Sequence, residues 1–353
     1  MHLEFQCYAL QHFYNMKILY GIQGTGNGHL IKSNIIIKEL KKRGHEIETI
    51  ISNRTKDNLL GMNVSEPFHC LKSLTFSVNK GAINYISSIK NLTLKDFLIN
   101  VKKIDTKKYD LVISDFEPIT AWAAKIQKKK VIGISHQNAL LYKGVPKKKR
   151  DIIAQLVLRW YCPTDIPIGI HWSHFKQPIL PPIIDEFPSD SVEEKKLILV
   201  YLNFEDPNQI VNVLKNFKDY LFKVYCSDFP TTFSSNIRCC KIDRKKFTND
   251  LLKASGVICN SGFELPSECF SLNKRVLVKP ISNQMEQESN ALAIEELNIG
   301  HTTAKLNTKV IGNWLQSDLR GYVPYKPVSE TFAEWIESGD FNDLKSLCDA
   351  SWS

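Results

Sequence analysis

The stretch CNSGFELPSECFSLNKRVLVKPISNQMEQESN, residues 259–290, contains two successive strand-to-helix turns. Residues 256–259 predict a buried strand, and the Ser261-Gly262 turn then leads into a short helix over residues 266–271. The next strand is predicted at residues 275–278, and a helix follows over residues 285–297. This alternation predicts a parallel sheet in which the helix starts share one edge.

The polar residues of this stretch gather at the two predicted helix starts. Free backbone N–H groups at a helix start bind anions, and the helix dipole adds to the attraction. The Ser261-Gly262 turn is therefore a candidate diphosphate site. Glu268 lies at its edge, where a carboxylate can accept hydrogen bonds from both hydroxyls of a ribose. The simpler alternative is that Glu268 only complements the dipole of its helix.

The second helix start carries Glu286, Gln287 and Asn290, so two adjacent helix starts offer polar groups to one cleft. The pattern S-G, E, P and Q-x-x-N-A resembles the donor-binding half of family 28-like GT-B glycosyltransferases, in the branch of the bacterial peptidoglycan N-acetylglucosaminyltransferase. That branch often has two adjacent glutamines where this chain has Glu286 and Gln287. The resemblance implies a donor site in which Ser261 and Gly262 approach the diphosphate, Glu268 holds the ribose, Gln287 contacts the donor sugar and Asn290 lies alongside.

A glycine-rich loop, GTGNGH, follows the apolar strand predicted at residues 17–22 and precedes a helix over residues 30–43. A dinucleotide site would have G-x-G-x-x-G and an acidic residue at the end of the second strand. Here the glycines are 24, 26 and 28, and the strand at residues 46–51 is followed by Ser52 and Asn53. The loop instead resembles the G-x-G-x-G-H loop of GT-B acceptor domains, which places Gly26 and Gly28 in an acceptor or phosphate loop.

His29 ends this loop, and a histidine there could take the proton from an acceptor hydroxyl. The alternative is a histidine that caps its helix or bonds within the core. Asp115, at the end of a strand over residues 111–114, could orient His29 or act as the base itself if burial raises its pKa. Glu117 and His136 are lesser candidates, and His136 lies in SHQNA, which resembles the H-x-Q-N stretch that shapes the acceptor side in the same branch.

The predicted fold is α/β with two Rossmann-like domains of the GT-B type, whose parallel sheets face a central cleft. Residues 1–15 are predicted to be an extension before a native start at Met16, with the acceptor domain over residues 16–162. Six prolines in residues 163–188 break the helical pattern and predict a linker over residues 163–194. The donor domain is predicted over residues 195–312, and a helical segment over residues 313–353 should pack back on the N-terminal domain.

The composition bears on the compartment, membrane contacts and cofactors expected for the protein. Nine scattered cysteines without a C-x-x-C pair, and no apolar run near the length of a spanning helix, predict a reduced, cytoplasmic protein. The formal net charge is +9, and the basic, partly apolar residues from Lys143 to Tyr161 could touch an anionic membrane surface or simply be solvated. Without a D-x-D motif at a strand end, we expect no metal or other cofactor besides the nucleotide sugar.

The resemblance implies an inverting transfer of a hexose or N-acetylhexosamine from a nucleotide sugar, with UDP expected, to a glycan, lipid-linked or small-molecule hydroxyl. A UDP-sugar 2-epimerase would share the two domains and the donor glutamate, but this chain shows no Arg- and His-rich donor loops. The alternative of another class is a non-catalytic module that binds a nucleotide, a glycan or nucleic acid. Nucleic acid is not expected as a partner, because the basic stretches lack interleaved aromatic residues.

Overall fold

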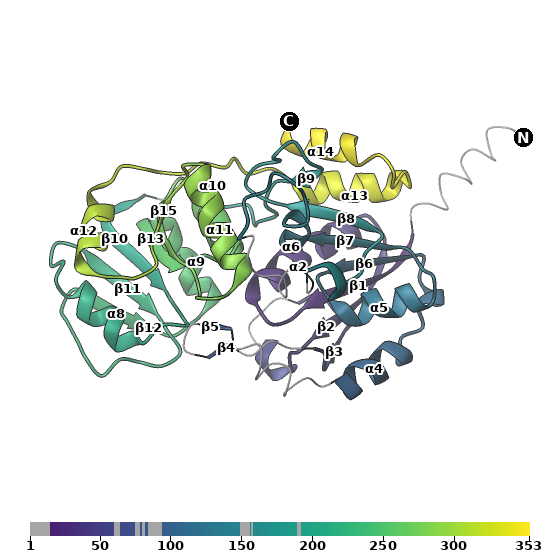
Figure 1. Cartoon of the computed structure of the whole chain (residues 1–353), viewed down its shortest axis with the longest axis horizontal. Coiled ribbons are helices and arrows are strands. Elements are labelled where there is room, and N and C mark those ends of the chain that lie inside the picture. The colour runs from purple at the N-terminus through teal and green to yellow at the C-terminus, as the bar shows by residue number, and fades with distance from the viewer. Residues whose placement is uncertain are drawn as a thin grey trace, which may run out of the picture.

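The computed structural model describes residues 15–59, 64–74, 78–79, 82–83, 94–148, 156, 158–188 and 192–353. Two lobes make up the molecule, each built around its own sheet with helices packed on it (Figure 1). The predicted start at Met16 and the extension before it concern residues that lie almost entirely outside the described part. None of the described helices is both long enough and apolar enough to cross a membrane.

The N-terminal lobe contains a seven-stranded parallel sheet in the order β3-β2-β1-β6-β7-β8-β9. Its strands are β1 Lys17–Gln23, β2 Glu46–Ser52, β3 Phe68–Leu71, β6 Leu111–Asp115, β7 Val131–Ser135, β8 Ile166–Ile170 and β9 Ile179–Leu180. The helices are α2 Asn27–Lys42, α4 Leu94–Lys103, α5 Pro118–Ile126 and α6 His136–Ala139, with short 3-10 turns at Asp57–Leu59 and Thr106–Lys108. A separate antiparallel pair joins β4 Val78–Asn79 to β5 Ala82–Ile83.

The C-terminal lobe contains a six-stranded parallel sheet in the order β12-β11-β10-β13-β14-β15. Its strands are β10 Glu194–Tyr201, β11 Leu221–Tyr225, β12 Ile237–Cys240, β13 Ala254–Asn260, β14 Arg275–Lys279 and β15 His301–Thr302. The helices are α8 Pro207–Leu214, α9 Arg244–Lys253, α10 Glu264–Ser271, α11 Met285–Glu296 and α12 Thr308–Gln316. The central strands of both sheets are buried apolar runs, as parallel sheets covered on both faces require.

The predicted linker is wrong for the residues that form β8 and β9. These two strands complete the N-terminal sheet beside β7, with Ile132 opposite Ile166 and Gly169 opposite Ile179. The apolar residues of β8 are almost completely buried at Ile168 and Ile170. The prolines of this segment exclude a long helix, but short strands separated by turns accommodate them, because each strand needs only a few ladder hydrogen bonds.

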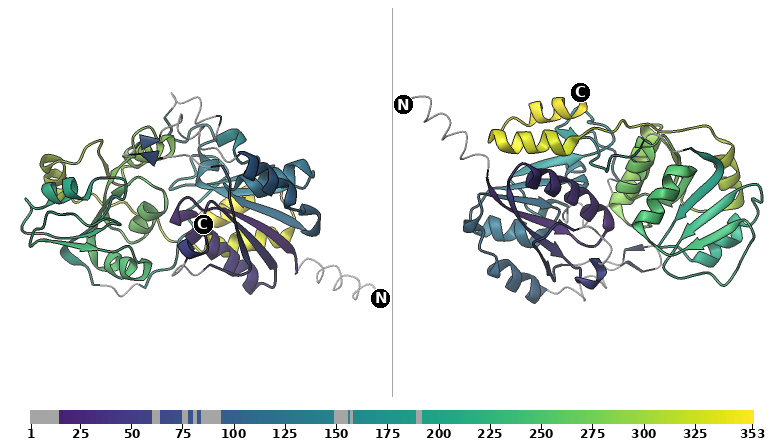
Figure 2. Two further views of the ribbon diagram at one scale, coloured as in Figure 1. Left: turned by 90° about the horizontal axis from the view of Figure 1, so that it is seen from below. Right: turned by 180° about the vertical axis from the view of Figure 1, so that it is seen from behind.

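The C-terminal helices pack back on the N-terminal lobe, as predicted. The end of the predicted helical segment forms two helices, α13 Val328–Ser338 and α14 Leu344–Trp352, because Gly339 adopts a left-handed conformation with φ 67° that ends α13. Arg43, directly after α2, lies 3.2 Å from Glu334 and 2.8 Å from Glu337 of α13. In Figures 1 and 2 both helices, in yellow, lie against the N-terminal lobe, far along the chain from the residues they cover.

Candidate active site

His29 and Asp115 are direct partners in the N-terminal lobe. His29 lies in the first turn of α2, after the glycine loop, and its Nδ1 is 2.8 Å from Oδ1 of Asp115 at the end of β6. Strands β1 and β6 are neighbours, and Ile22 pairs with Asp115 just before the loop that carries His29. The strand register thus brings the loop and the carboxylate to one edge of the sheet.

Two more residues of α2 hold the same carboxylate. Lys32 donates to Oδ1 of Asp115 and Ser33 donates to Oδ2, each at 2.8 Å. Positions three and four residues after His29 share its face of the helix, so one helical turn brings all three side chains to Asp115. The side chain of Asp115 is fully buried and accepts these three hydrogen bonds.

The pKa of Asp115 is lowered, so the condition under which Asp115 would itself act as the base is not met. Burial alone would raise this pKa, but the neighbouring His29 and Lys32 outweigh burial and hold it below its usual value. Asp115 is therefore an ionised acceptor, suited to orient a partner. Because an ionised carboxylate can only accept, Nδ1 of His29 is the donor to Asp115, and in the neutral imidazole Nε2 keeps its lone pair. The geometry can thus present a histidine base that Asp115 orients.

The start of α10 lies in the opposite lobe, where its first-turn amides receive no side-chain cap. Ser261 precedes it and is fixed by a 2.8 Å hydrogen bond from its hydroxyl to the carbonyl of Gln287. Around Gly262, a Cβ atom would meet nothing within 4 Å. Unsatisfied amides beside open space form a site that an anion such as a phosphate can fill.

Glu268 lies one turn further along α10 and is 2% exposed. Its two carboxylate oxygens accept hydrogen bonds from Arg244 at 2.6 and 3.1 Å. Arg244 begins α9, which Asp243 caps, and it also lies 3.6 Å from Asp185. Burial raises the pKa of Glu268, and the guanidinium of Arg244 opposes that rise. The sequence analysis placed Glu268 at the edge of the proposed diphosphate site but did not predict this ion pair with Arg244.

Gln287 and Asn290 make hydrogen bonds within the protein in this structure. Oε1 of Gln287 accepts from the backbone N–H of Ile281 at 2.9 Å. The amide of Asn290 donates to the carbonyl of Ser261 at 2.9 Å, and its oxygen lies 2.6 Å from Nε2 of His136. These two side chains therefore brace the turns around the open space at Gly262.

His136 lies where the two lobes meet, away from open space. Its Nδ1 is 2.9 Å from the carbonyl of Ile170, and its ring stacks on Phe263 with centroids 4.1 Å apart. Burial lowers its pKa. Glu117, the other lesser candidate, caps α5 by accepting from the amides of Ile119 and Thr120. In this structure both His136 and Glu117 form hydrogen bonds with neighbouring protein groups.

The two lobes touch at the glycine loop, so the histidine and the helix start face one site. A Cβ atom on Gly28 would lie only 2.3 Å from Cγ of Glu264, the first residue of α10. The amide nitrogen of Gln137 lies 3.4 Å from Nε2 of His29 and donates to Glu286 at 3.1 Å. His29 thus faces the starts of both α10 and α11. Gly26, two residues before Gly28, has open space around it.

The model of the family described as glycosyl transferase family 1 matches residues 16–318. The chain belongs to this family. The prediction of a GT-B glycosyltransferase is confirmed at that level, and the fold of solved glycosyltransferases agrees with it. The comparisons do not single out the narrower family 28-like branch that the sequence analysis named. Comparison with curated protein sequences found no match.

Solved structures share the fold over nearly the whole chain. The glycotransferase of kitacinnamycin is 15% identical with a TM-score of 0.61, covering 95% of this chain and 97% of that one. Arabidopsis thaliana UGT89C1 complexed with UDP is 11% identical with a TM-score of 0.57, covering 96% and 99%. The glycosyltransferase VinC in complex with dTDP is 12% identical with a TM-score of 0.52, covering 95% and 100%.

Several residues of this glycosyltransferase site were not singled out from the sequence. Lys32 and Ser33 could have been found from their spacing after His29 on one predicted helix. Gln137 was quoted only as part of SHQNA. The partners of Arg244 and Glu264 come from elements distant in sequence, so the sequence pattern held no signal for them. The set is Lys32, Ser33, Gln137, Arg244 and Glu264.

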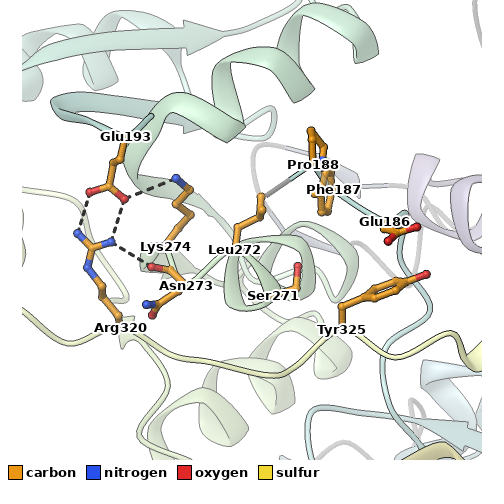
Figure 3. A pocket seen from close by; sticks show the side chains of 10 residues that line it. All are labelled: Glu186, Phe187, Pro188, Glu193, Ser271, Leu272, Asn273, Lys274, Arg320 and Tyr325. Carbon is orange, nitrogen blue, oxygen red and sulfur yellow. Dashed lines mark hydrogen bonds and ion pairs between the residues drawn. The ribbon is translucent and has the colours of Figure 1, made fainter. Parts of the chain in front are cut away.

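A cavity of about 400 Å³ lies elsewhere in the described part of this glycosyltransferase. Figure 3 shows it at the far end of α10, where Ser271, Lys274 and Arg320 line it. The carboxylate of Glu193 forms ion pairs there with Arg320 at 2.9 Å and with Lys274 at 3.5 Å. Because Gly262 and His29 lie at the other end of α10, this cavity is separate from the candidate active site. The described residues contain no cluster of three His, Cys, Asp or Glu side chains that could hold a metal ion.

Proposed function

We propose that this glycosyltransferase is an inverting enzyme that moves a hexose or N-acetylhexosamine from a UDP-sugar to the hydroxyl of a glycan, lipid-linked or small-molecule acceptor. One observation carries the proposal: an Asp115-oriented His29 faces the uncapped start of α10 across the contact between Gly28 and Glu264. A base on one lobe and an anion site on the other are what transfer between two bound substrates requires. The UDP and dTDP complexes of structural neighbours support a nucleoside diphosphate as the donor group.

The reaction then proceeds as a single displacement. The acceptor hydroxyl gives its proton to Nε2 of His29, and its oxygen attacks the anomeric carbon. The bond from that carbon to the diphosphate breaks, and the amides after Ser261 and Gly262 hold the departing anion. Because the attacking oxygen enters opposite the leaving group, the configuration inverts. Asp115 keeps His29 in the reactive tautomer and stabilises the imidazolium that forms.

The remaining donor contacts follow the resemblance. Glu268 holds the ribose through acceptor positions that Arg244 leaves free, since a carboxylate can accept about four hydrogen bonds. Gln287 contacts the sugar, and Asn290 keeps the turn at Ser261 in place. We propose that the reaction needs no metal, because the backbone amides of the helix start can stabilise the negative charge of the diphosphate in place of a metal cation. Activity that is lost in EDTA and restored by Mn²⁺ would contradict this part of the proposal.

The central experiment is a screen of UDP-sugars for hydrolysis and transfer with the wild type and two variants. His29→Ala should keep nucleotide binding and lose transfer by roughly 10²–10⁴-fold, the usual contribution of a general base. Glu268→Ala should lose nucleotide binding. His69→Ala is the matched control, because that histidine is 58% exposed on β3 and lies away from the site. Transfer that survives in His29→Ala would remove His29 from the mechanism.

The rival functions give different results in the same screen. A UDP-sugar 2-epimerase would change the sugar at C2 without any acceptor. A non-catalytic module would bind UDP, a glycan or nucleic acid and turn over none of the sugars. Nucleic-acid binding without any response to UDP would contradict both the proposed partners and the proposed reaction.

A peripheral membrane contact is a second proposal, carried by apolar side chains on the surface. Leu156 and Trp160 are 52% and 59% exposed, in the basic segment predicted to touch lipid. Lys148, however, is paired with Glu288 at 2.6 Å, which leaves fewer cations for a bilayer. Residues 149–155 and 157 of this segment lie outside the described part. Flotation with anionic and neutral liposomes tests the contact, and Trp160→Ser should weaken it.

A further inference from the structure

Glu264 is placed between the two halves of the proposed reaction. It is the first residue of α10, directly after the Ser261-Gly262 turn and Phe263, so its backbone belongs to the proposed diphosphate site. Its side chain crosses to the other lobe, because a Cβ atom on Gly28 would lie 2.3 Å from its Cγ and 3.5 Å from its Cδ. The carboxyl group therefore lies beside the loop that presents His29.

The carboxyl group of Glu264 lacks the partners that its neighbours have. Oε2 of Glu264 is buried and makes no hydrogen bond to any of the described residues. By contrast, Asp115 accepts three hydrogen bonds and Glu268 accepts two from Arg244. Leaving a buried polar oxygen unsatisfied costs free energy. An unsatisfied oxygen beside an uncapped helix start indicates a ligand that forms hydrogen bonds with both the oxygen and the free helix amides.

The electrostatic surroundings favour the neutral form of Glu264. Burial raises the pKa of its carboxyl group to about 8, and nearby carboxylates add to the rise, whereas Lys32 opposes it. The charged and titratable groups that face it are Lys32 and His29 of α2, Asp115 of β6, Glu268 of its own helix and Glu286 of α11. At neutral pH the group is therefore a carboxylic acid with one O–H donor.

Resting on the proposed function, we propose that Glu264 binds the donor diphosphate as a neutral carboxylic acid whose hydroxyl donates a hydrogen bond to a phosphate oxygen. A carboxylate at this position would repel the diphosphate, whereas the acid adds a donor to those of the helix amides. This role differs from that of Glu268, whose carboxylate faces a cation. Donor binding is then linked to protonation, so the affinity must fall once Glu264 ionises in the free protein.

The test is the dissociation constant of UDP, measured by calorimetry between pH 7 and 9.5. In the wild type the affinity should fall by about tenfold per pH unit above pH 8, as linkage to one proton requires. Glu264→Gln should bind with a flat profile, because an amide still donates and does not ionise. Glu264→Leu should bind about ten- to a hundredfold more weakly at pH 7, as the loss of a hydrogen bond to a charged group implies. Glu296→Gln, at an exposed glutamate of α11, should match the wild type.

The comparison of wild type with Glu264→Gln also removes other sources of pH dependence. Any titration of UDP itself affects both proteins equally, and the melting temperature verifies that each variant is folded. Parallel profiles in the two proteins would overturn the role of Glu264 and leave the proposed reaction standing. If neither UDP nor dTDP binds the wild type at pH 7, the proposed donor is wrong and the inference about Glu264 falls with it.

Discussion

At the scale of single residues, Asp115 determines the tautomer of His29, the proposed base. Three donors from one face of α2 surround its carboxylate at 2.8 Å, so His29 has one tautomer available to it. The pKa of Asp115 is held below its usual value despite full burial, and the carboxylate therefore stays ionised throughout the neutral range. The site needs no second base for the proposed displacement.

We predict that Asp115→Asn lowers kcat by roughly 10²–10⁴-fold, because the uncharged amide neither fixes the tautomer of His29 nor stabilises its charged form. The dissociation constant of UDP should stay unchanged, since the donor site lies in the other lobe. Ser33→Ala removes only one neutral hydrogen bond from the same carboxylate and is the matched control. A variant that loses kcat and UDP binding in equal measure would contradict the separation of roles.

Arg244→Ala should weaken UDP binding by about ten- to a hundredfold, because it leaves Glu268 buried without its cation. The pKa of Glu268, already raised by burial, should rise further, so that a larger share is protonated and cannot accept from ribose hydroxyls. The loss should therefore be smaller at higher pH, where Glu268 regains its charge. Titration calorimetry checks this, with Arg238→Ala as the control at an exposed arginine of β12.

The sequence predicted His29, Asp115 and Glu268 because each follows a recognisable strand end or glycine turn. It did not predict what these residues touch. The partner of Glu268 is Arg244, 24 residues away, and the group beside Gly28 is Glu264 of the other lobe. The first pairing depends on how α9 and α10 pack on one sheet, and the second on how the two lobes meet. Local sequence patterns encode neither.

At the scale of elements, the helices at the site differ from their neighbours in their starts. Asp206, Asp243 and Asn307 cap α8, α9 and α12 through side-chain hydrogen bonds. No side chain caps α2, α10 or α11, which meet at the candidate site. Helix α13, which packs on α2, also begins without a side-chain cap, so the missing caps do not by themselves identify the site. At α2, α10 and α11 they leave backbone amides free for a ligand.

Gly262→Ala should separate binding from stability. A Cβ atom there meets no atom within 4 Å, and Gly262 does not have a positive φ, so the melting temperature should remain within about 2 °C of the wild type. The new methyl group would instead occupy space proposed for the diphosphate and weaken UDP binding about tenfold or more. Gly312→Ala, on the distant helix α12, should leave UDP binding unchanged. Unaltered binding in Gly262→Ala would move the diphosphate away from this turn.

Strands and helices with one uninterrupted apolar pattern were predicted well, because burial on both faces of a parallel sheet leaves an unambiguous run. The strands β8 and β9 were missed because proline signals outweighed three alternating isoleucines at positions 166, 168 and 170. The predicted C-terminal helical segment could not be divided into α13 and α14 from the sequence, because Gly339 could be either an interior glycine or a helix end until its φ is known.

At the scale of the whole molecule, the C-terminal helices tie the end of the chain to the lobe in which it began. The chain leaves the N-terminal lobe before β10, forms the C-terminal lobe and returns through α13 and α14. Arg43, directly after α2, bridges Glu334 and Glu337, while Trp352 donates to the carbonyl of Ile179 in β9 at 2.7 Å. The N-terminal core therefore depends on residues that follow the whole C-terminal lobe in sequence.

Phe332→Ala tests this dependence. Phe332 of α13 is fully buried in the core cluster that also contains Ile36 and Leu40 of α2. Its truncation should lower the free energy of unfolding by about 3–5 kcal/mol, as for other buried phenylalanines. Phe233→Ala, at a side chain that is 81% exposed, should cost less than about 0.5 kcal/mol. Denaturant unfolding measures both, and UDP binding measured on folded Phe332→Ala should be retained because the C-terminal lobe, which carries the proposed donor site, has its own sheet. If Phe332→Ala were no less stable than Phe233→Ala, the return of α13 to α2 would contribute nothing to the N-terminal lobe.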